Sequence, residues 1–224
     1  MSISVIIPVY NQAKSIRKCL KSVFNQTFKD FEVIVVNDGS TDSFKVAIRP
    51  WETKIKLFNQ ANQGAPKARN FGFSKSKGEY VLFCDADIVM KPYMLEKMHT
   101  LLLRKKAFAY AYSSFKMGLK KFKLWSFDGE KLRKTPYIHS TSLMRRECFP
   151  GWDENLKKFQ DWDLWLAMLE KGQKGIWIPE YLFAIKSKGT MSSWIPKSMY
   201  VFPWLKSVRK YKEAEKIIKQ KHNI

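Results

Sequence analysis

Residues 80–87 read YVLFCDAD, an apolar run that leads directly into two carboxylates. A short, nearly continuous apolar run is typical of a strand buried on both faces of a sheet. The same reasoning predicts strands at residues 4–9 and 31–37, and an alternating pattern predicts another at residues 55–58. Helical spacing predicts helices between and after them, at residues 16–24, 65–73 and 92–103. Strand–helix–strand repeats form a mostly parallel sheet covered by helices, so the sequence predicts an α/β, Rossmann-like fold.

Polar loops follow three of these strands, at residues 10–11, 37–42 and 85–87. Ligands of such sheets bind at the carboxyl ends of the strands, so the three loops are expected to converge on one crevice. Asn11 is expected to cap the helix that follows the first loop.

The second half of the chain is less regular. Strands are predicted at residues 107–112, 138–144, 175–178 and 182–185, and helices at residues 160–171 and 208–221. No linker rich in Ser or Gly divides the chain. We therefore expect one domain at residues 1–192, with a nucleotide-binding half (1–90) and an acceptor-binding half (91–192), followed by a basic aromatic segment at 193–224.

Charge is the unusual feature of the composition. The 224 residues carry 41 Lys and Arg against 20 Asp and Glu, a formal net charge of +21. The surplus lies in the second half: residues 97–134 hold 11 basic and two acidic residues, and residues 186–224 hold 10 and two. Such a surplus favours a polyanionic partner, which leaves nucleic acid, an anionic membrane surface and phosphorylated small molecules open.

The location is predicted to be cytoplasmic. The chain has no apolar stretch of the roughly 18 residues that a membrane-spanning helix needs, and its start does not read as a secretory signal. Three widely spaced cysteines, Cys19, Cys84 and Cys148, fit neither a disulfide framework nor a metal site.

Several charged residues have both a chemical and a structural interpretation. Asp85 and Asp87 suit a hard divalent cation and a sugar hydroxyl, or a solvated turn. Asp38 is placed to contact a base, or to form an ordinary Asp-Gly-Ser turn. Arg69 could face a diphosphate or lie on a helix surface. Asp161, at the start of a helix whose dipole favours its ionised form, suits a general base or an N-cap.

No catalytic constellation involving histidine can be assembled from the sequence. His99, His139 and His222 lack the spacing of metal ligands, and each is expected to be structural or solvated.

Six motifs together resemble family 2 glycosyltransferases, in the order in which they occur there. They are VIIPVYN (5–11), VNDGSTD (36–42), NQG with ARNFG (62–64, 68–72), DAD (85–87), GWDE (151–154) and QDWDLW (160–165). The resemblance covers about residues 3–192. It implies a GT-A fold, a UDP-sugar donor, inversion at the anomeric carbon, and a glycan or lipid-linked acceptor.

The resemblance also implies roles for individual residues. Asp161 matches the catalytic base, and Asp87 matches the ligand of a divalent metal, Mn²⁺ or Mg²⁺. Donor binding is implied for Pro8, Val9, Tyr10, Asn11, Asp38, Asn62, Gly64, Arg69, Asp85 and Ala86. Acceptor binding is implied for Trp152, Asp153, Glu154 and Trp162.

Two positions depart from the family pattern. Gln160 stands where a glutamate commonly precedes the base, and Ser187 stands where a histidine is common. We expect that Lys186 or Lys188 neutralises the diphosphate instead, which would weaken the metal requirement.

Aromatic and basic residues alternate near the end of the chain. Trp194, Tyr200, Phe202, Trp204 and Tyr211 are interleaved with Lys197, Lys206, Arg209, Lys210 and Lys212. This pattern suits an interfacial anchor on the inner face of the cell membrane, and it equally suits a segment whose aromatic residues pack on the domain.

Three other functions remain open at this point. A nucleic-acid-binding module is disfavoured because the charge avoids the half that bears the motifs. The other two are a nucleotidyltransferase on a similar sheet and a transferase-like protein that binds without catalysis.

Overall fold

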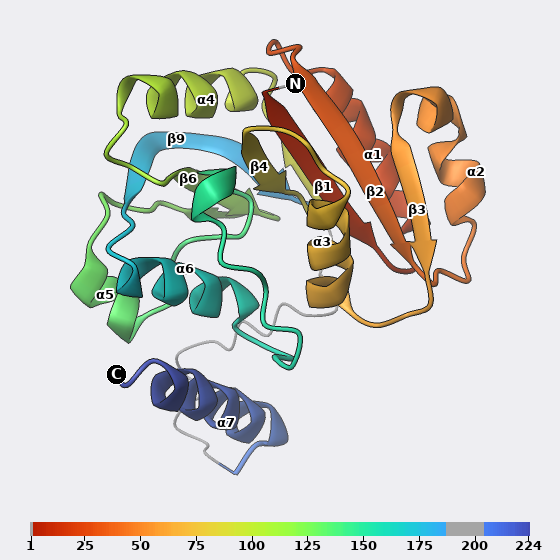
Figure 1. The fold of residues 1–224 in the computed structure, drawn as a ribbon. Coiled ribbons are helices and arrows are strands. Elements are labelled where there is room, and N and C mark those ends of the chain that lie inside the picture. Colours follow the sequence, from red (N-terminus) through yellow and green to blue (C-terminus); the bar gives the residue numbers. More distant parts are fainter. Residues whose placement is uncertain (1, 187–203) are drawn as a thin grey trace.

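The computed structural model of the protein describes residues 2–186 and 204–224 (Figure 1). Its strands are β1 (Ile3–Val9), β2 (Phe31–Asp38), β3 (Lys56–Gln60), β4 (Tyr80–Phe83), β5 (Ile88–Met90), β6 (Tyr110–Met117), β7 (Lys120–Phe122), β8 (Leu143–Arg145) and β9 (Gly175–Ile185). Its α-helices are α1 (Ala13–Phe24), α2 (Phe44–Ile48), α3 (Ala65–Ser74), α4 (Met94–Arg104), α5 (Gly129–Lys134), α6 (Gln160–Glu170) and α7 (Lys206–Lys221). Short 3₁₀ helices occupy Arg49–Lys54 and Arg146–Cys148.

One sheet, with strand order β3-β2-β1-β4-β8-β6-β9-β5 and β7 paired to β6, runs through both halves of the chain. The first four strands in this order are parallel. All seven residues of β1 are buried, as a strand covered on both faces requires. Beyond β4, antiparallel pairs appear, because β8 pairs in that sense with both β4 and β6. The predicted α/β class is confirmed, and the second half adds the antiparallel strands.

Four strand predictions in the second half were wrong in their bounds. The strand predicted at 107–112 begins at Tyr110 and runs to Met117. The one predicted at 138–144 is reduced to β8, because His139 makes local hydrogen bonds with the Thr141 amide (3.0 Å) and the Ser142 hydroxyl (2.8 Å), which favour a turn. The strands predicted at 175–178 and 182–185 are one strand, β9, whose pairing with β6 shifts register at Pro179 and Glu180.

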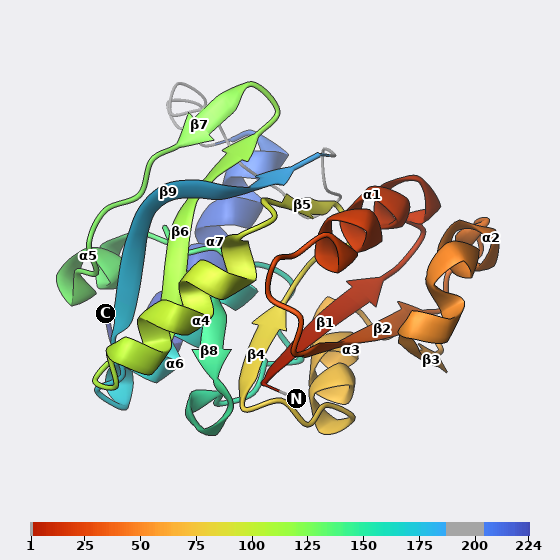
Figure 2. The same ribbon diagram turned by 90° about the horizontal axis from the view of Figure 1, so that it is seen from above.

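Helices cover both faces of the sheet. Figure 2 shows α1, α2 and α4 in front of the sheet and α3 and α6 behind it. The helix α3 packs closely on β1, because a Cβ on Gly72 would lie 2.5 Å from Cγ2 of Ile6. Trp162 and Trp165 of α6 are among the largest fully buried side chains, so the core continues from the first half of the chain (residues 1–90) into the second half.

The C-terminal helix α7 lies outside α6 (Figure 1). Ile218 of this helix is fully buried and belongs to the hydrophobic core, so α7 packs on the domain. Trp204, just before it, is 72% exposed. The proposed anchor residues Trp194, Lys197, Tyr200 and Phe202 lie outside the described residues, as do Ser187, Lys188 and the predicted boundary at residue 192. Within residues 2–186 and 204–224, no helix combines the length and the apolar character that crossing a membrane requires.

Candidate active site

A cavity of about 590 Å³ opens where β1, β2 and β4 end. All three predicted loops contribute to its lining, through Tyr10, Asp38 and Asp87. Asp161 reaches the same cavity from the first turn of α6. Its volume lies in the range of about 300–1,000 Å³ that is usual for ligand pockets. The predicted convergence of the loops is therefore what the structure shows.

Asn11 holds two loops together and does not line the cavity. Its backbone is left-handed (φ 50°), and its side-chain oxygen accepts hydrogen bonds from the backbone N–H of Thr41 (2.8 Å) and of Asp42 (3.3 Å). The prediction that Asn11 caps α1 was wrong, because a carboxylate of Asp42 accepts the bond from the Ala13 N–H instead (2.8 Å). The donor-binding role of Asn11 stays a prediction.

Asp38 combines a turn-stabilising role with a place in the cavity wall. One carboxylate oxygen accepts hydrogen bonds from the Gln60 side chain and the Gln63 N–H, and the other from the Gly64 N–H, each at 2.8 Å. Gly64 has φ 91°, a conformation that favours glycine, and α3 begins at the next residue. Asp38 thus fixes the start of α3 at the rim of the cavity, and its contact with a base stays a prediction.

Arg69 connects the donor loops to α6. Its guanidinium donates to Asp85 Oδ1 (2.6 Å) and to Gln160 Oε1 (3.1 Å), and it lies over the ring of Trp152 at 4.6 Å. Arg69 is only 3% exposed, so the alternative of a helix-surface arginine was wrong. Burial alone would raise the pKa of Asp85, but the charges of Arg69 and His139 and the hydrogen bond from Arg69 together outweigh burial and lower that pKa. The residue that replaces the expected glutamate, Gln160, is therefore a partner of Arg69.

The Asp87 side chain is mostly buried and lines the cavity. Its carbonyl accepts a hydrogen bond from the Lys186 N–H (2.9 Å), and the Lys186 side chain is exposed. No group of three potential metal ligands of the His, Cys, Asp or Glu type occurs among the described residues. One or two carboxylates do suit Mg²⁺ or Mn²⁺, because such ions commonly complete their coordination with water and substrate phosphate. The donor set at Asp87 fits a cation of this kind.

Asp161 is the second residue of α6, and Phe159 occupies the N-cap position, so the N-cap alternative for Asp161 was wrong. Burial raises the pKa of Asp161, and the charges of His139 and Arg69 oppose that shift only in part. That the helix dipole keeps this carboxylate ionised stays a prediction. A carboxylate whose pKa is raised in a cavity has the character of a general base.

The four predicted acceptor-binding residues all lie outside the cavity lining. Trp152 packs edge-on against Phe83 with ring centroids 5.2 Å apart, and the indole of Trp162 donates to the Leu132 carbonyl (2.6 Å). Asp153 pairs with Lys221 of α7 (2.7 Å), and Glu154 accepts from Asn70 (2.9 Å). These contacts give the four residues structural roles. Their acceptor-binding role stays a prediction.

The remaining predicted donor residues all line the cavity. They are Pro8, Val9, Tyr10, Asp38, Asn62, Gly64, Arg69, Asp85 and Ala86. Sequence reasoning missed the opposite wall, which consists of Phe115, Met117, Phe122, Pro136, His139, Ser140, Lys157, Lys158, Phe159, Ile185 and Tyr211. These residues come from a hairpin, several loops and the last helix, and their sequence spacing carries no signal that they meet.

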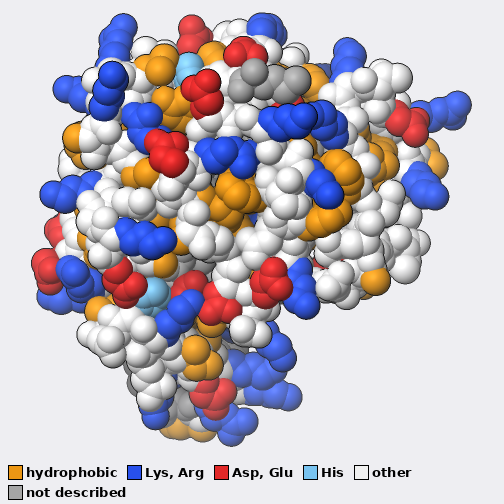
Figure 3. Space-filling model, viewed as in Figure 1, with side chains coloured by type: hydrophobic (Ala, Val, Ile, Leu, Met, Phe, Trp, Pro, Cys, Tyr) orange, Lys and Arg blue, Asp and Glu red, His pale blue; other side chains and the backbone are white. Residues whose placement is uncertain are grey.

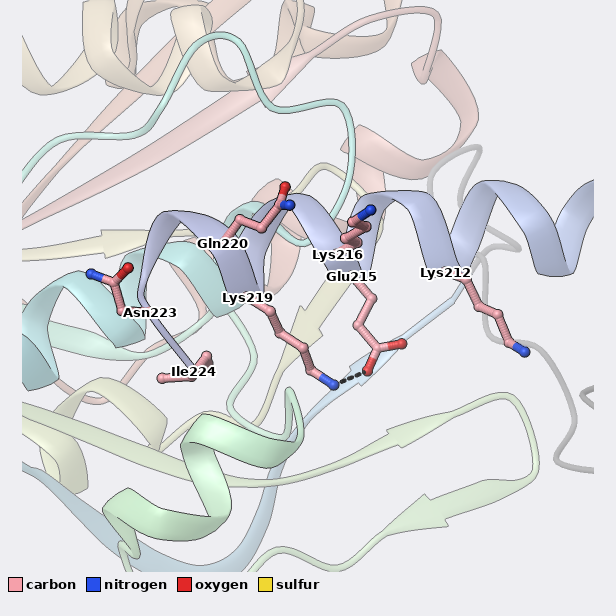
Figure 4. A pocket seen from close by; sticks show the side chains of 7 residues that line it. All are labelled: Lys212, Glu215, Lys216, Lys219, Gln220, Asn223 and Ile224. Carbon is pink, nitrogen blue, oxygen red and sulfur yellow. Dashed lines mark ion pairs between the residues drawn. The ribbon is translucent and has the colours of Figure 1, made fainter.

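A second recess lies on the surface of α7, and it differs from the cavity in the residues that line it. Figure 4 shows its lining, which consists of Lys212, Glu215, Lys216, Lys219, Gln220, Asn223 and Ile224. Lys219 and Glu215 form an ion pair within it (2.9 Å). Every lining residue belongs to α7 or to the three residues that follow it, and none comes from the six predicted family motifs. The cavity at the strand ends is therefore the candidate active site.

A cavity at the carboxyl ends of parallel strands, lined by carboxylates and a buried arginine, is typical of α/β enzymes that bind phosphorylated ligands. Residues 4–151, more than half of the chain, match the family described as glycosyl transferase family 2. The chain belongs to this family. The nucleotidyltransferase and the nucleic-acid-binding module lose their support with this finding.

Curated proteins and solved structures agree with this assignment. An uncharacterized glycosyltransferase of Rickettsia bellii is 29% identical over 215 residues, which cover 88% of this chain and 30% of the relative. The chain spans about a third of the length of the curated relatives that it matches first.

Two solved structures share the fold. S. aureus TarS 1-349 in complex with UDP-GlcNAc has a TM-score of 0.73 at 22% identity, over 90% of this chain and 64% of the TarS 1-349 chain. The mannosyltransferase PcManGT from Pyrobaculum calidifontis, in complex with GDP-Man and Mn²⁺, has a TM-score of 0.66 at 20% identity, over 86% of this chain and 59% of that protein. At these identities the likeness supports the predicted GT-A-like fold.

Proposed function

We propose that the protein transfers a sugar from a UDP-sugar to a hydroxyl of a glycan or lipid-linked acceptor, with inversion and with Asp161 as general base. One observation carries this proposal: Asp87 and Asp161, from distant parts of the chain, line one cavity together with Asp38 and Arg69. A cation site and a proton acceptor on one cavity are what a displacement at a sugar carbon requires.

The residues of the chain divide the chemistry between them. Asp161 would accept the proton of the attacking hydroxyl, which is a poor nucleophile until that proton leaves. Its raised pKa increases its affinity for that proton. Arg69 holds Asp85 and Gln160 in place, so the donor wall and the base-bearing helix keep a fixed relation. Positioning of this kind lowers the entropic part of the barrier.

A divalent cation, Mn²⁺ or Mg²⁺, held by Asp87 and the donor diphosphate, would act as a Lewis acid on the leaving group. The Mn²⁺ complex of PcManGT supports a divalent cation in this fold. The TarS complexes with UDP and UDP-GlcNAc support a uridine donor. Asp38, at the end of β2, is the residue that we assign to the base, and Asp85 to the ribose or sugar.

We also propose peripheral attachment to an anionic membrane surface on the cytoplasmic side. Trp204 is largely exposed, and Lys206, Arg209 and Lys210 of α7 are exposed beside it. Figure 3 shows Lys and Arg side chains gathered on α7 as well as on the main body. Each basic residue near an anionic surface contributes about 1 kcal/mol to binding. Flotation with anionic and with neutral vesicles tests this, and equal binding to both would contradict it.

A screen of nucleotide-sugars, with and without Mn²⁺, tests the proposed activity. Thermal stabilisation and hydrolysis are measured for UDP-, GDP- and CMP-sugars. We expect metal-dependent stabilisation and slow release of UDP with UDP-sugars only. Binding without any release of nucleotide under all conditions would instead indicate a transferase-like protein that does not catalyse.

A further inference from the structure

The wall of the cavity beside Asp161 combines two lysines with two aromatic side chains. Lys157, Lys158 and Phe159 lie on the loop that leads into α6, and Tyr211 reaches the same cavity from α7. Figure 1 shows α7 alongside α6 and this loop, so residues about 50 positions apart in the sequence share one wall. We call these four residues the loop–α7 wall.

The two aromatic rings of this wall are held in place. Phe159 and Tyr211 pack edge to face, with ring centroids 4.9 Å apart and planes at 80°, and Phe159 also packs on the buried Trp162 at 5.5 Å. Phe159 has a left-handed backbone (φ 57°), which is rare for a bulky residue and is tolerated only where the surroundings impose it. The two rings therefore form a fixed apolar surface, and Phe159 lies two residues before Asp161 in the sequence.

The two lysines of the wall have no ion-pair partner within residues 2–186 and 204–224. Of the carboxylates nearest in sequence, Asp153 pairs with Lys221 and Glu154 accepts from Asn70, whereas Asp161 lines the same cavity as the lysines. Two adjacent cations on a cavity wall attract an anionic ligand.

The position of the lysines favours the acceptor over the donor. The donor residues lie at the ends of β1, β2 and β4, whereas the lysines lie on the loop that leads into α6, the helix that carries the proposed base. A hydroxyl that gives its proton to Asp161 brings the rest of its molecule against this loop.

We propose that the loop–α7 wall is an acceptor subsite for an anionic sugar, one that carries a phosphate or a carboxylate. The sugar ring packs on Phe159 and Tyr211, and Lys157 and Lys158 bind its anionic group. This inference rests on the proposed function, because it assumes that the neighbouring part of the cavity holds a UDP-sugar.

Binding of simple probes to protein saturated with UDP and Mg²⁺ tests the subsite without a known acceptor. The probes are glucose 6-phosphate, glucuronate and glucose, measured by saturation-transfer NMR or calorimetry. UDP occupies the donor site, so the probes report on the acceptor side. We expect at least tenfold tighter binding of one or both anionic sugars than of glucose, and the comparison of the two separates phosphate from carboxylate recognition.

Two variants and a matched control locate the effect. Lys157→Gln with Lys158→Gln is expected to remove the preference for anionic sugars and to leave UDP affinity unchanged. Tyr211→Ala is expected to weaken all three probes. Lys171→Gln with Lys174→Gln removes the same charge from exposed positions outside the cavity and is expected to change neither.

The outcomes separate the two proposals. If wild-type protein binds UDP but shows no preference for the anionic sugars, or if the control variant loses that preference as fully as the loop variant, the subsite is wrong and the proposed function stands. If the loop variant loses UDP affinity, the lysines serve the donor and the inference is overturned. If wild-type protein does not bind UDP, the proposed donor fails, and the inference fails with it.

Discussion

The half that we predict to bind the nucleotide (residues 1–90, the donor half) and the half that we predict to bind the acceptor (91–192, the acceptor half) are built by different means. In the donor half, β1 to β4 are parallel, and the loops that follow the buried strands β1, β2 and β4 line the cavity together with the loop that follows the less buried β3. In the acceptor half, the cavity wall combines the β6–β7 hairpin, the loop before α6 and one residue of α7. The first wall is assembled from neighbours in the sheet, and the second from segments far apart in the sequence.

The difference shows where a glycosyltransferase of this kind has freedom to vary. A strand end fixes the position of a carboxylate such as Asp87 by backbone geometry. A wall such as the one at Lys157 and Tyr211 depends on how separate elements pack. The donor half therefore suits the invariant part of the chemistry, and the acceptor half suits the part that changes with the acceptor.

The largest expected effect separates base chemistry from donor binding. Asp161→Asn removes the proton acceptor and preserves the shape of the side chain. General base catalysis contributes about 10²–10⁴-fold, so we expect a loss of that size in the rate of UDP release. UDP affinity is expected to stay within about twofold of wild type.

Asp163→Asn is an unsuitable control for this variant, because Asp163 is buried in ion pairs with Lys221 and His222. Asp30→Asn changes a carboxylate remote from the cavity lining and makes the same isosteric change. Turnover that survives Asp161→Asn would place the base elsewhere.

The second prediction concerns the donor wall. Asp87→Ala removes the carboxylate that we assign to the cation, so UDP affinity in the presence of Mn²⁺ is expected to fall about 10–100-fold, or about 1.4–2.8 kcal/mol. Without metal the variant and the wild type are expected to bind UDP equally. Calorimetric titration with and without Mn²⁺ measures both values, and an unchanged metal dependence would count against Asp87.

Most of the donor half could be predicted from the sequence because its signals are local. Apolar runs mark strands buried on both faces, and the residues after them must lie at one edge of a parallel sheet. Asp38, Asp85 and Asp87 were found in this way. Asn11 was misjudged because Asp42, 29 residues from Ala13, supplies the capping oxygen. Local helix-start rules do not contain that contact.

The acceptor half could be predicted only in part, because its contacts are not periodic. The helix at 160–171 was recognised by its spacing, but no pattern indicates that Gln160 binds Arg69, 91 residues earlier. The resemblance assigned Trp152 and Trp162 to the acceptor, although both side chains are buried and make structural contacts. Tyr211 was grouped with a surface anchor, whereas it packs on Phe159 in the cavity wall.

The third prediction tests how α7 is held against the acceptor half. His222 lies between Asp163 (2.8 Å) and Glu170 (2.6 Å), and Lys221 pairs with Asp163 (2.6 Å) and Asp153 (2.7 Å). Burial alone would lower the pKa of His222, but its bonds to the two carboxylates outweigh burial and raise it. We expect His222→Gln to weaken the docking of α7 by about 1–2 kcal/mol, seen as faster hydrogen exchange of its amides.

The same contacts give a pH dependence of known sign. Because the pKa of His222 is raised on folding, its stabilising effect is complete below the ordinary value of about 6.5 and is lost as pH rises through the folded value. After correction for the intrinsic exchange rate, the protection of the α7 amides against hydrogen exchange is expected to fall as pH rises from the ordinary histidine pKa through the folded pKa of His222. This fall is expected in the wild type and not in His222→Gln. Parallel pH profiles in the two proteins would contradict this role.

The smallest expected effect is a shift in the pH dependence of the rate, and it concerns Gln160, whose side chain links α6 to Arg69. Asp161 must be ionised to act, and burial raises its pKa, so the acidic limb of the rate profile is expected above the ordinary aspartate value of about 3.9. Gln160→Glu would place a carboxylate on Arg69 and beside Asp161, which reduces the favourable field of Arg69 and adds a like charge. Both changes favour the protonated form of Asp161.

We therefore expect the acidic limb of UDP release to move to higher pH in Gln160→Glu, by up to about one unit. Gln220→Glu adds the same charge on the exposed surface of α7 and is expected to leave the limb in place. A limb that does not move in Gln160→Glu would mean that the base does not sense charge at position 160. In that case Arg69 would link the two halves through its hydrogen bonds alone, and the neutral residue before the base would have no electrostatic consequence.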